Sequence, residues 1–136
     1  MDAIMSSVEY MGELRTKSIH LKSGQTITTD APIDNQGKGE AFSPTDLVSS
    51  ALSSCMMTIM GQVANREGVD LKGLKSEVVK IMSPHPRKIA EIKVIFSHPE
   101  LKASEVQKQK LMNAARTCPV ALSLSENLIQ TVIFNF

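Results

Sequence analysis

The chain has 136 residues, 42% of them hydrophobic, and its 15 basic and 14 acidic side chains give a net charge of +1. This length predicts one domain over residues 1–136 that folds without a disulfide or a metal, and the scattered basic residues argue against a nucleic-acid partner. We see no signal peptide and no apolar stretch of the ~20 residues that span a bilayer, so we expect a cytoplasmic protein that binds no membrane.

The opening segment predicts an antiparallel meander of three strands. They are expected at residues 7–12, 15–21 and 25–29. Apolar Ile19 and Leu21 alternate with polar neighbours, and β-branched residues fill the third segment. A turn at Ser23-Gly24 joins the second strand to the third. Residues 30–42 are rich in turn formers and predict a loop.

A long helix is predicted from Pro44 to about Glu67. Ser43 is a favourable N-cap, and Asp46 completes a capping box with a charge that suits the helix start. Gly68 is expected to end this helix by adopting the left-handed backbone conformation. The predicted apolar face consists of Leu47, Ala51, Leu52, Cys55, Ile59 and Val63. Small residues fill much of the other surface, so we expect this helix to be central and packed on both sides, in a homodimer with a large apolar interface.

The second half predicts three strands, a helix and a short helical turn. The strands are expected at residues 69–82, 88–98 and 128–136, the helix at 104–117 and the helical turn at 120–123, after Pro119. Residues 83–86 form a hairpin loop, and Ser104 caps the helix. The final strand has apolar residues at both odd and even positions, so both of its faces are apolar, which predicts that it is buried. This order of elements predicts an α+β protein.

The two cysteines, Cys55 and Cys118, are the candidates for chemistry. In a reducing compartment a pair of cysteines is more often free, catalytic or redox-sensing than a structural disulfide. A helical cysteine such as Cys55 is more often a buried core residue. Cys118 precedes Pro119 at a helix start, where backbone N–H groups and the helix dipole can stabilise a thiolate. The inert and the reactive interpretation of this residue both stay open.

No metal or cofactor site is expected from the residue pattern. His20, His85 and His98 lack the spacing of metal ligands. The Gly37-Lys38-Gly39 segment lacks the strand-to-helix context of a phosphate-binding loop.

Several short motifs together resemble one family over nearly the whole chain. They are Tyr10-x-Gly12-x-Leu14-Arg15, Thr29-Asp30-Ala31-Pro32, Gly37-Lys38-Gly39-Glu40, Phe42-Ser43-Pro44-Thr45-Asp46-Leu47, Ala51-Leu52-x-x-Cys55 and Cys118-Pro119-Val120. This set resembles the OsmC/Ohr superfamily of thiol-dependent hydroperoxide reductases, and the OsmC-like group most closely. The resemblance implies an OsmC/Ohr-like fold, with antiparallel sheets wrapped around two central helices in an intertwined homodimer. It also implies that no metal, flavin or haem is needed.

The resemblance implies a role for each candidate residue. Cys55 would be the attacking thiol, Cys118 the resolving thiol, and Arg15 the cation that holds Cys55 as a thiolate. In the family a glutamate that orients the arginine follows the proline at the helix start. Thr45 occupies that place here, so Glu40 or Asp46 is expected to serve instead.

The implied activity is reduction of organic hydroperoxides, and of hydrogen peroxide, to alcohols or water during oxidative stress. A sulfenic acid and then an intramolecular disulfide would form, and an external dithiol would reduce the disulfide. Two other functions stay open: a dimer that binds a small ligand with Cys55 lining its pocket, and a redox sensor whose disulfide changes a partner surface.

Overall fold

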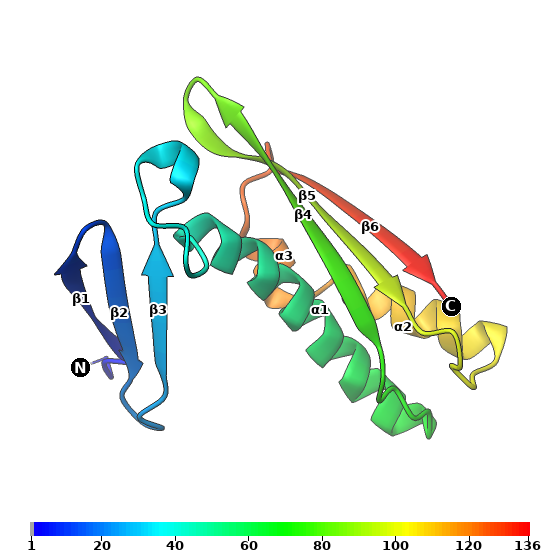
Figure 1. Ribbon diagram of the computed structural model, residues 1–136. Coiled ribbons are helices and arrows are strands. Elements are labelled where there is room, and N and C mark those ends of the chain that lie inside the picture. The colour runs from blue at the N-terminus through cyan, green and yellow to red at the C-terminus, as the bar shows by residue number, and fades with distance from the viewer. Residues whose placement is uncertain (1) are drawn as a thin grey trace. The chain divides into compact units, whose positions relative to one another are not determined.

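The computed structural model describes residues 2–136 and confirms the α+β class (Figure 1). The chain divides into two compact units, Met1–Leu47 and Val48–Phe136, with the boundary inside the first long helix. A single domain over residues 1–136 stays a prediction.

The first unit is an antiparallel meander in the order β1-β2-β3. Its strands are β1 (Ser6–Gly12), β2 (Arg15–His20) and β3 (Thr26–Asp30), each within one residue of the predicted bounds. The loop that follows contains a short 3-10 helix, η1 (Ile33–Asn35). The register of β2 and β3 places Arg15 directly opposite Asp30. Because paired residues of adjacent strands share a face, these two side chains are neighbours on the sheet.

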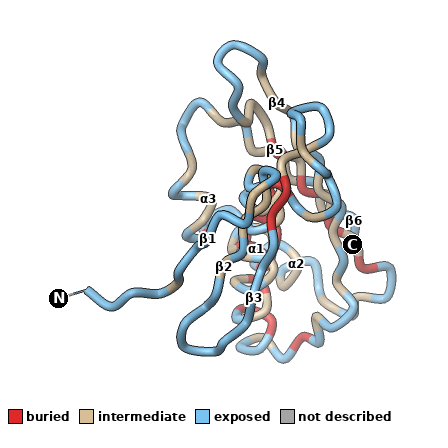
Figure 2. Tube along the Cα trace, turned by 60° about the vertical axis from the view of Figure 1, so that its left-hand side comes forward, coloured by how far each residue is buried: buried red, intermediate tan, exposed pale blue. Residues whose placement is uncertain are grey.

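The first unit has no buried apolar side chain among its described residues. The buried side chains between residues 2 and 47 are the polar Thr29, Asp30 and Ser43. Among the three strands of this unit, only the end of β3 carries the buried colour in Figure 2, while β1 and β2 are exposed or intermediate. A three-stranded sheet normally needs a covered apolar face to be stable.

Helix α1 (Pro44–Glu67) begins and ends as its sequence predicts. The Ser43 backbone N–H donates to the Asp46 carboxylate at 3.0 Å, and the Asp46 N–H donates to the Ser43 hydroxyl at 3.1 Å. These reciprocal bonds form the capping box. At the other end Gly68 has a φ of 70°, and Val69 N–H donates to the Ala64 carbonyl at 2.9 Å, which closes the helix in the left-handed manner expected.

The buried face of α1 includes Leu52 and Val63 of the predicted face, but the other buried apolar side chains lie one position away from it. Leu52, Met56 and Met60 are fully buried, whereas Ala51 is exposed and Cys55 is half-buried. The larger Leu and Met side chains bury more apolar area than alanine does, so their stripe faces the sheet. Cys55 therefore lies at the edge of the core and can be reached from outside.

Helix α1 is long and apolar enough to cross a membrane, judged by length and composition alone. This differs from the expectation that no apolar stretch reaches the required length, because its serines reduce its hydropathy less than we assumed. Within its most apolar stretch, 39% of the residues are buried in the protein. The core helix of a soluble protein meets the same test, so the absence of a membrane partner stays a prediction.

The second unit contains a sheet in the order β4-β5-β6. Its strands are β4 (Lys75–Pro84), β5 (Arg87–Ser97) and β6 (Ile129–Asn135). Strand β4 starts later than predicted, because a turn with Gly73 at a φ of 97° occupies the preceding residues. Strands β4 and β5 are antiparallel, but β6 pairs parallel to β5, which differs from the antiparallel sheets that the resemblance implied. The crossover through α2 (Glu105–Ala115) and α3 (Pro119–Ser123) permits this pairing.

The core of the second unit lies between this sheet and helices α1 and α2 (Figure 1). Strand β5 contributes Ile92, Val94 and Phe96, which are completely buried. The prediction that β6 is buried is wrong for one of its faces: Phe134 stacks on Phe96, but Ile133 is 43% exposed. Strand β6 is at the edge of the sheet, and Ile129 on its second face is exposed as well.

Candidate active site

The structure brings the two cysteines together within the second unit. Cys55 lies on α1, half-buried and packed against the core cluster that contains Cys118. Cys118 is completely buried at the N-cap of α3, where its sulfur accepts the Ala121 backbone N–H at 3.3 Å. Both thiols are free. One accessible and one shielded thiol therefore share a site.

Burial outweighs the helix start in setting the charge of Cys118. Burial raises the pKa of the Cys118 thiol, and a hydrogen bond with Cys55 and the charge of Cys55 raise this pKa further. The backbone N–H groups of Ala121 and Val120 act in the opposite direction without cancelling the rise. The expected thiolate stabilisation at this position is thus present but is the weaker effect. Cys118 stays protonated at neutral pH and is a poor first nucleophile.

Arg15, at the start of β2, is held by two carboxylates within the first unit. Its Nε donates to Asp30 Oδ1 at 2.7 Å, and its Nη2 donates to Asp30 Oδ2 at 2.8 Å. The same Nη2 donates to Glu40 Oε1 at 3.0 Å. The Asp30 side chain is fully buried, whereas that of Glu40 is 67% exposed. The guanidinium therefore has one strong bidentate partner and one weaker partner in contact with solvent.

This ion pair keeps both Arg15 and Asp30 charged. Hydrogen bonds from Arg15 hold the pKa of Asp30 below its usual range, although burial alone would raise it. The hydrogen bonds to Asp30 in turn raise the pKa of Arg15 above its already high value. Arg15 is a permanent cation with a fixed orientation.

Asp30 is the residue that the sequence reasoning missed. The predicted third strand ended at residue 29, so Asp30 fell into the loop and was not considered as a partner of Arg15. The expected turn at Ser23-Gly24 would have paired residue 15 with residue 32, whereas the observed register is shifted by two residues and pairs Arg15 with Asp30. Glu40, which was considered, does bind Arg15. Thr45 shares a hydrogen bond with Ser43 at 3.2 Å, and Asp46 accepts the capping bond described above.

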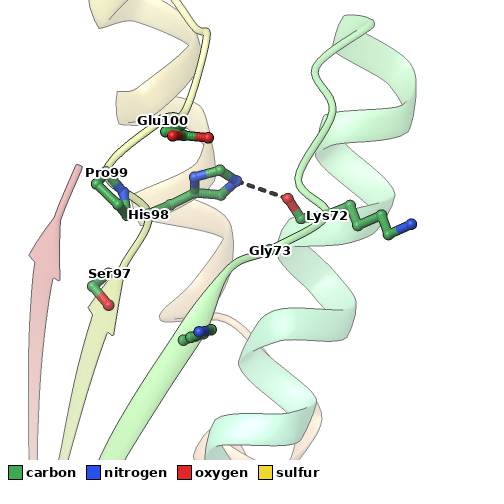
Figure 3. Close-up of a pocket in the computed structure, with 7 residues that line it drawn as sticks. Lys72, Gly73, Ser97, His98, Pro99 and Glu100 are labelled. Carbon is green, nitrogen blue, oxygen red and sulfur yellow. Dashed lines mark hydrogen bonds between the residues drawn. The ribbon is translucent and has the colours of Figure 1, made fainter.

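Two cavities of the second unit are lined by other residues. One of about 290 Å³ lies beside His98, whose Nε2–H donates to the Lys72 carbonyl at 2.9 Å (Figure 3). The other, of about 480 Å³, lies between α1 and α2 and is lined in part by Arg66 and Lys110. Neither is lined by Cys55 or Cys118. Across residues 2–136 no group of three His, Cys, Asp or Glu side chains is arranged to hold a metal ion.

Comparisons with known proteins agree with this arrangement. The family model described as OsmC-like protein matches residues 37–132. A protein of known structure from Psychrobacter arcticus 273-4, provisionally described as an osmotic stress induced and detoxification response protein, is 43% identical. The match covers 99% of this chain and 98% of that one, with a TM-score of 0.95.

More distant structures show the same fold. The organic hydroperoxide resistance protein OsmC from Legionella pneumophila is 15% identical with a TM-score of 0.68, and all of both chains is covered. The organic hydroperoxide resistance protein OhrB of Bacillus subtilis is 15% identical with a TM-score of 0.65, covering 97% of this chain and 98% of that one. A comparison with curated proteins found no match.

Proposed function

The chain belongs to the OsmC-like protein family, and from this premise we propose that it is a Cys-dependent peroxidase that reduces organic hydroperoxides and hydrogen peroxide. The observation that carries the proposal is the pairing of a half-buried Cys55 with a fully buried, protonated Cys118. Structures of the same fold include organic hydroperoxide resistance proteins, which supports a role in peroxide defence.

The chemistry takes three steps. The Cys55 thiolate attacks the O–O bond of the hydroperoxide, so that an S–O bond forms and the O–O bond breaks, and the leaving alkoxide takes one proton from the solvent to become the alcohol. Cys55 is then a sulfenic acid. The Cys118 sulfur, having lost its proton, attacks the Cys55 sulfur and releases water as the disulfide forms. An external dithiol then reduces this disulfide by thiol–disulfide exchange.

The two thiols differ in the way that this order requires. Cys55 is at the edge of the core, where a peroxide can reach it, whereas Cys118 is shielded. Because its pKa is raised, Cys118 does not compete for the first attack. Cys55 packs against the core cluster that contains Cys118, which supports the proposal that Cys118 can reach the sulfenic acid once it has formed.

Arg15 is proposed to stabilise negative charge at Cys55 and on the peroxide oxygen that leaves. A fixed hydrogen-bond donor at a developing charge lowers the barrier without reorganising during the reaction. Asp30 and Glu40 hold the Arg15 guanidinium so that it needs no such reorganisation.

The functional form is proposed to be a homodimer. The first unit buries no apolar side chain among residues 2–47, and the outer faces of α1 and β6 carry uncovered apolar residues. A second copy is the partner proposed to cover them. An interface of roughly 2,000 Å² or more, of the obligate class, is expected.

The decisive experiment is stopped-flow consumption of cumene hydroperoxide by the reduced protein in the presence of a dithiol. We expect repeated turnover, with the Cys55→Ser variant as the inactive control. If the natural protein consumes no more peroxide than this control, peroxide reduction is not its function. The small-ligand and redox-sensor alternatives would then be separated by whether oxidation of the two thiols changes binding of a partner.

A further inference from the structure

We propose that helix α3 is a redox-sensitive element whose N-cap is the resolving thiol itself. Cys118 caps α3 while it is reduced, and its disulfide with Cys55 removes that cap and loosens the helix. The disulfide comes from the proposed function, on which this inference therefore rests. What is added is that the backbone around the site, and not the two sulfurs alone, differs between the two redox states.

Cys118 has the geometry of a helix N-cap. Its backbone is extended, with φ −68° and ψ 147°, and Pro119 occupies the first position of α3. Its sulfur accepts the Ala121 N–H at 3.3 Å, and its carbonyl accepts the Leu122 N–H at 3.1 Å. Serine, threonine, aspartate and asparagine are the residues preferred at an N-cap, because each supplies an oxygen. The sulfur differs from those oxygens in that it can form a covalent bond with a second thiol.

Helix α3 depends on its cap more than a longer helix does. It has five residues, far below the ~12–15 at which an isolated helix becomes even marginally stable. None of these residues is fully buried, and Leu122 is 73% exposed. The Gln130 side chain, on β6, donates to the Ala121 carbonyl at 2.9 Å. Loss of the Cys118 sulfur therefore leaves the Ala121 N–H without its acceptor, in the first turn of a helix that has little other support.

Disulfide formation takes the sulfur away from this N–H. The Cys118 thiolate attacks the sulfur of the Cys55 sulfenic acid, so the S–S bond forms and the S–O bond breaks. The leaving hydroxide combines with the proton from Cys118 as water. The Cys118 sulfur is then held against Cys55 on α1, and its position is no longer set by Ala121 on α3.

A loosened α3 gives the external dithiol a way to the disulfide. In the reduced protein Cys118 is fully buried, and its sulfur lies against the Ala121 amide in the first turn of α3. The thiolate of the reductant must reach one of the two sulfurs before exchange can occur. Opening of this turn in the oxidised protein uncovers the disulfide, while the reduced thiol stays shielded.

The test is hydrogen exchange of the Ala121 and Leu122 amides, measured by NMR in the reduced protein and in its disulfide form. Diamide forms the disulfide by taking two hydrogens from the thiol pair, so the measurement does not depend on peroxide turnover. We expect both amides to exchange roughly fivefold faster in the disulfide form, the factor that corresponds to a lost N-cap. The Leu111 amide, inside α2, is the internal reference and should exchange equally in both forms.

Two variants separate the loss of the cap from the disulfide, both measured in the reduced protein. Cys118→Ser replaces the sulfur with an oxygen that can cap α3, whereas Cys118→Ala removes the acceptor. Both variants lose the same buried thiol and neither can form the disulfide. Cys118→Ala should show the fast exchange of the disulfide form without oxidation, and Cys118→Ser should retain the slow exchange of the natural protein.

Equal exchange of the Ala121 amide in the reduced and the disulfide form overturns the inference, as does equal exchange in the two variants. Failure of diamide to join Cys55 to Cys118 overturns it too. A disulfide that diamide forms with faster exchange, but that peroxide does not form, refutes the proposed function instead and leaves α3 as a helix that responds to thiol oxidation.

Discussion

Two effects act on the pKa of Cys118 in opposite directions, and the larger one sets its protonation state. Its position at a helix start offers two backbone N–H groups to the sulfur, which favours the thiolate. Complete burial and a neighbouring thiol favour the neutral form, and their effect on the pKa of Cys118 is the larger one. The sequence showed the helix start but could not show the burial, and so it left the reactivity of Cys118 open.

The two cysteine variants should fail at different steps. Cys55→Ser should abolish peroxide reduction, because only the attacking sulfur must be a thiolate. Cys118→Ser should still reduce about one equivalent of peroxide per protein and then stop, since the sulfenic acid forms before the second sulfur acts. Quenched single-turnover assays measure both. A fully active Cys55→Ser protein would contradict the assigned roles.

Peroxide treatment should produce an intramolecular Cys55–Cys118 disulfide, with Cα atoms under about 7 Å apart or a segment that moves to bring them there. The packing of Cys55 against the core cluster that contains Cys118 is the reason for this expectation. Peptide mapping without reductant identifies the bond. Recovery of only a sulfinic acid on one cysteine would show that Cys118 does not resolve the intermediate.

The Asp30 carboxylate should make stability depend on acid pH. Its pKa is lowered in the folded protein, so its contribution is complete above the ordinary aspartate value of about 3.9 and is lost as the pH falls through the folded value. Asp30→Asn should therefore lower Tm at pH 7, and the difference from the natural protein should shrink towards pH 3. A difference that stays constant with pH would mean that the Arg15–Asp30 pair does not stabilise the fold.

Among the elements, α1 shows most clearly which structural features a sequence pattern can predict and which it cannot. Its start, its end and its central place were predictable, because capping residues act locally. Which stripe would be buried was not, since apolar residues surround much of the helix and several stripes are nearly equivalent. The facing sheet selects the stripe of Leu52, Met56 and Met60, and no local signal specifies a sheet formed later in the chain.

The selected stripe can be tested by truncation. Leu52→Ala should lower the free energy of unfolding by about 2–5 kcal/mol, because it removes completely buried methyl groups from a packed core. Thr58→Ala, on the exposed side of the same helix, should change it by no more than about 0.5 kcal/mol. Urea denaturation at a fixed protein concentration measures both changes. Equal effects would show that α1 is not oriented as described.

For the molecule as a whole, the class, the element order and most boundaries were predictable from periodicity and caps, whereas pairings between distant segments were not. The parallel pairing of β5 with β6 and the bond from Arg15 to Asp30 both depend on which segments meet. The exposed face of β6 was missed for a related reason: an apolar residue that stays exposed has the same sequence pattern as one that is buried in the core.

The protein should sediment as a dimer at micromolar concentration in analytical ultracentrifugation. One face of the first sheet carries Val8, Tyr10 and Ile27, which are exposed in the single chain, and the other face is mostly polar. Ile27→Asp should weaken association, because it places a charge within the apolar interface. Thr28→Asp, next in sequence but on the opposite face, should have a much smaller effect. A monomer at this concentration would refute the dimer.

The parallel pairing of β6 has a consequence for the folding order of the chain. Cys118 lies in the crossover between β5 and β6, so the crossover is anchored at both ends only once the last strand has joined the sheet. Contacts between residues far apart in sequence form late, because a long loop must close first. The newly made chain should therefore acquire a working thiol pair only at its last folding step. Until then Cys55 has no partner and is open to over-oxidation, so peroxide stress should damage nascent protein more than folded protein.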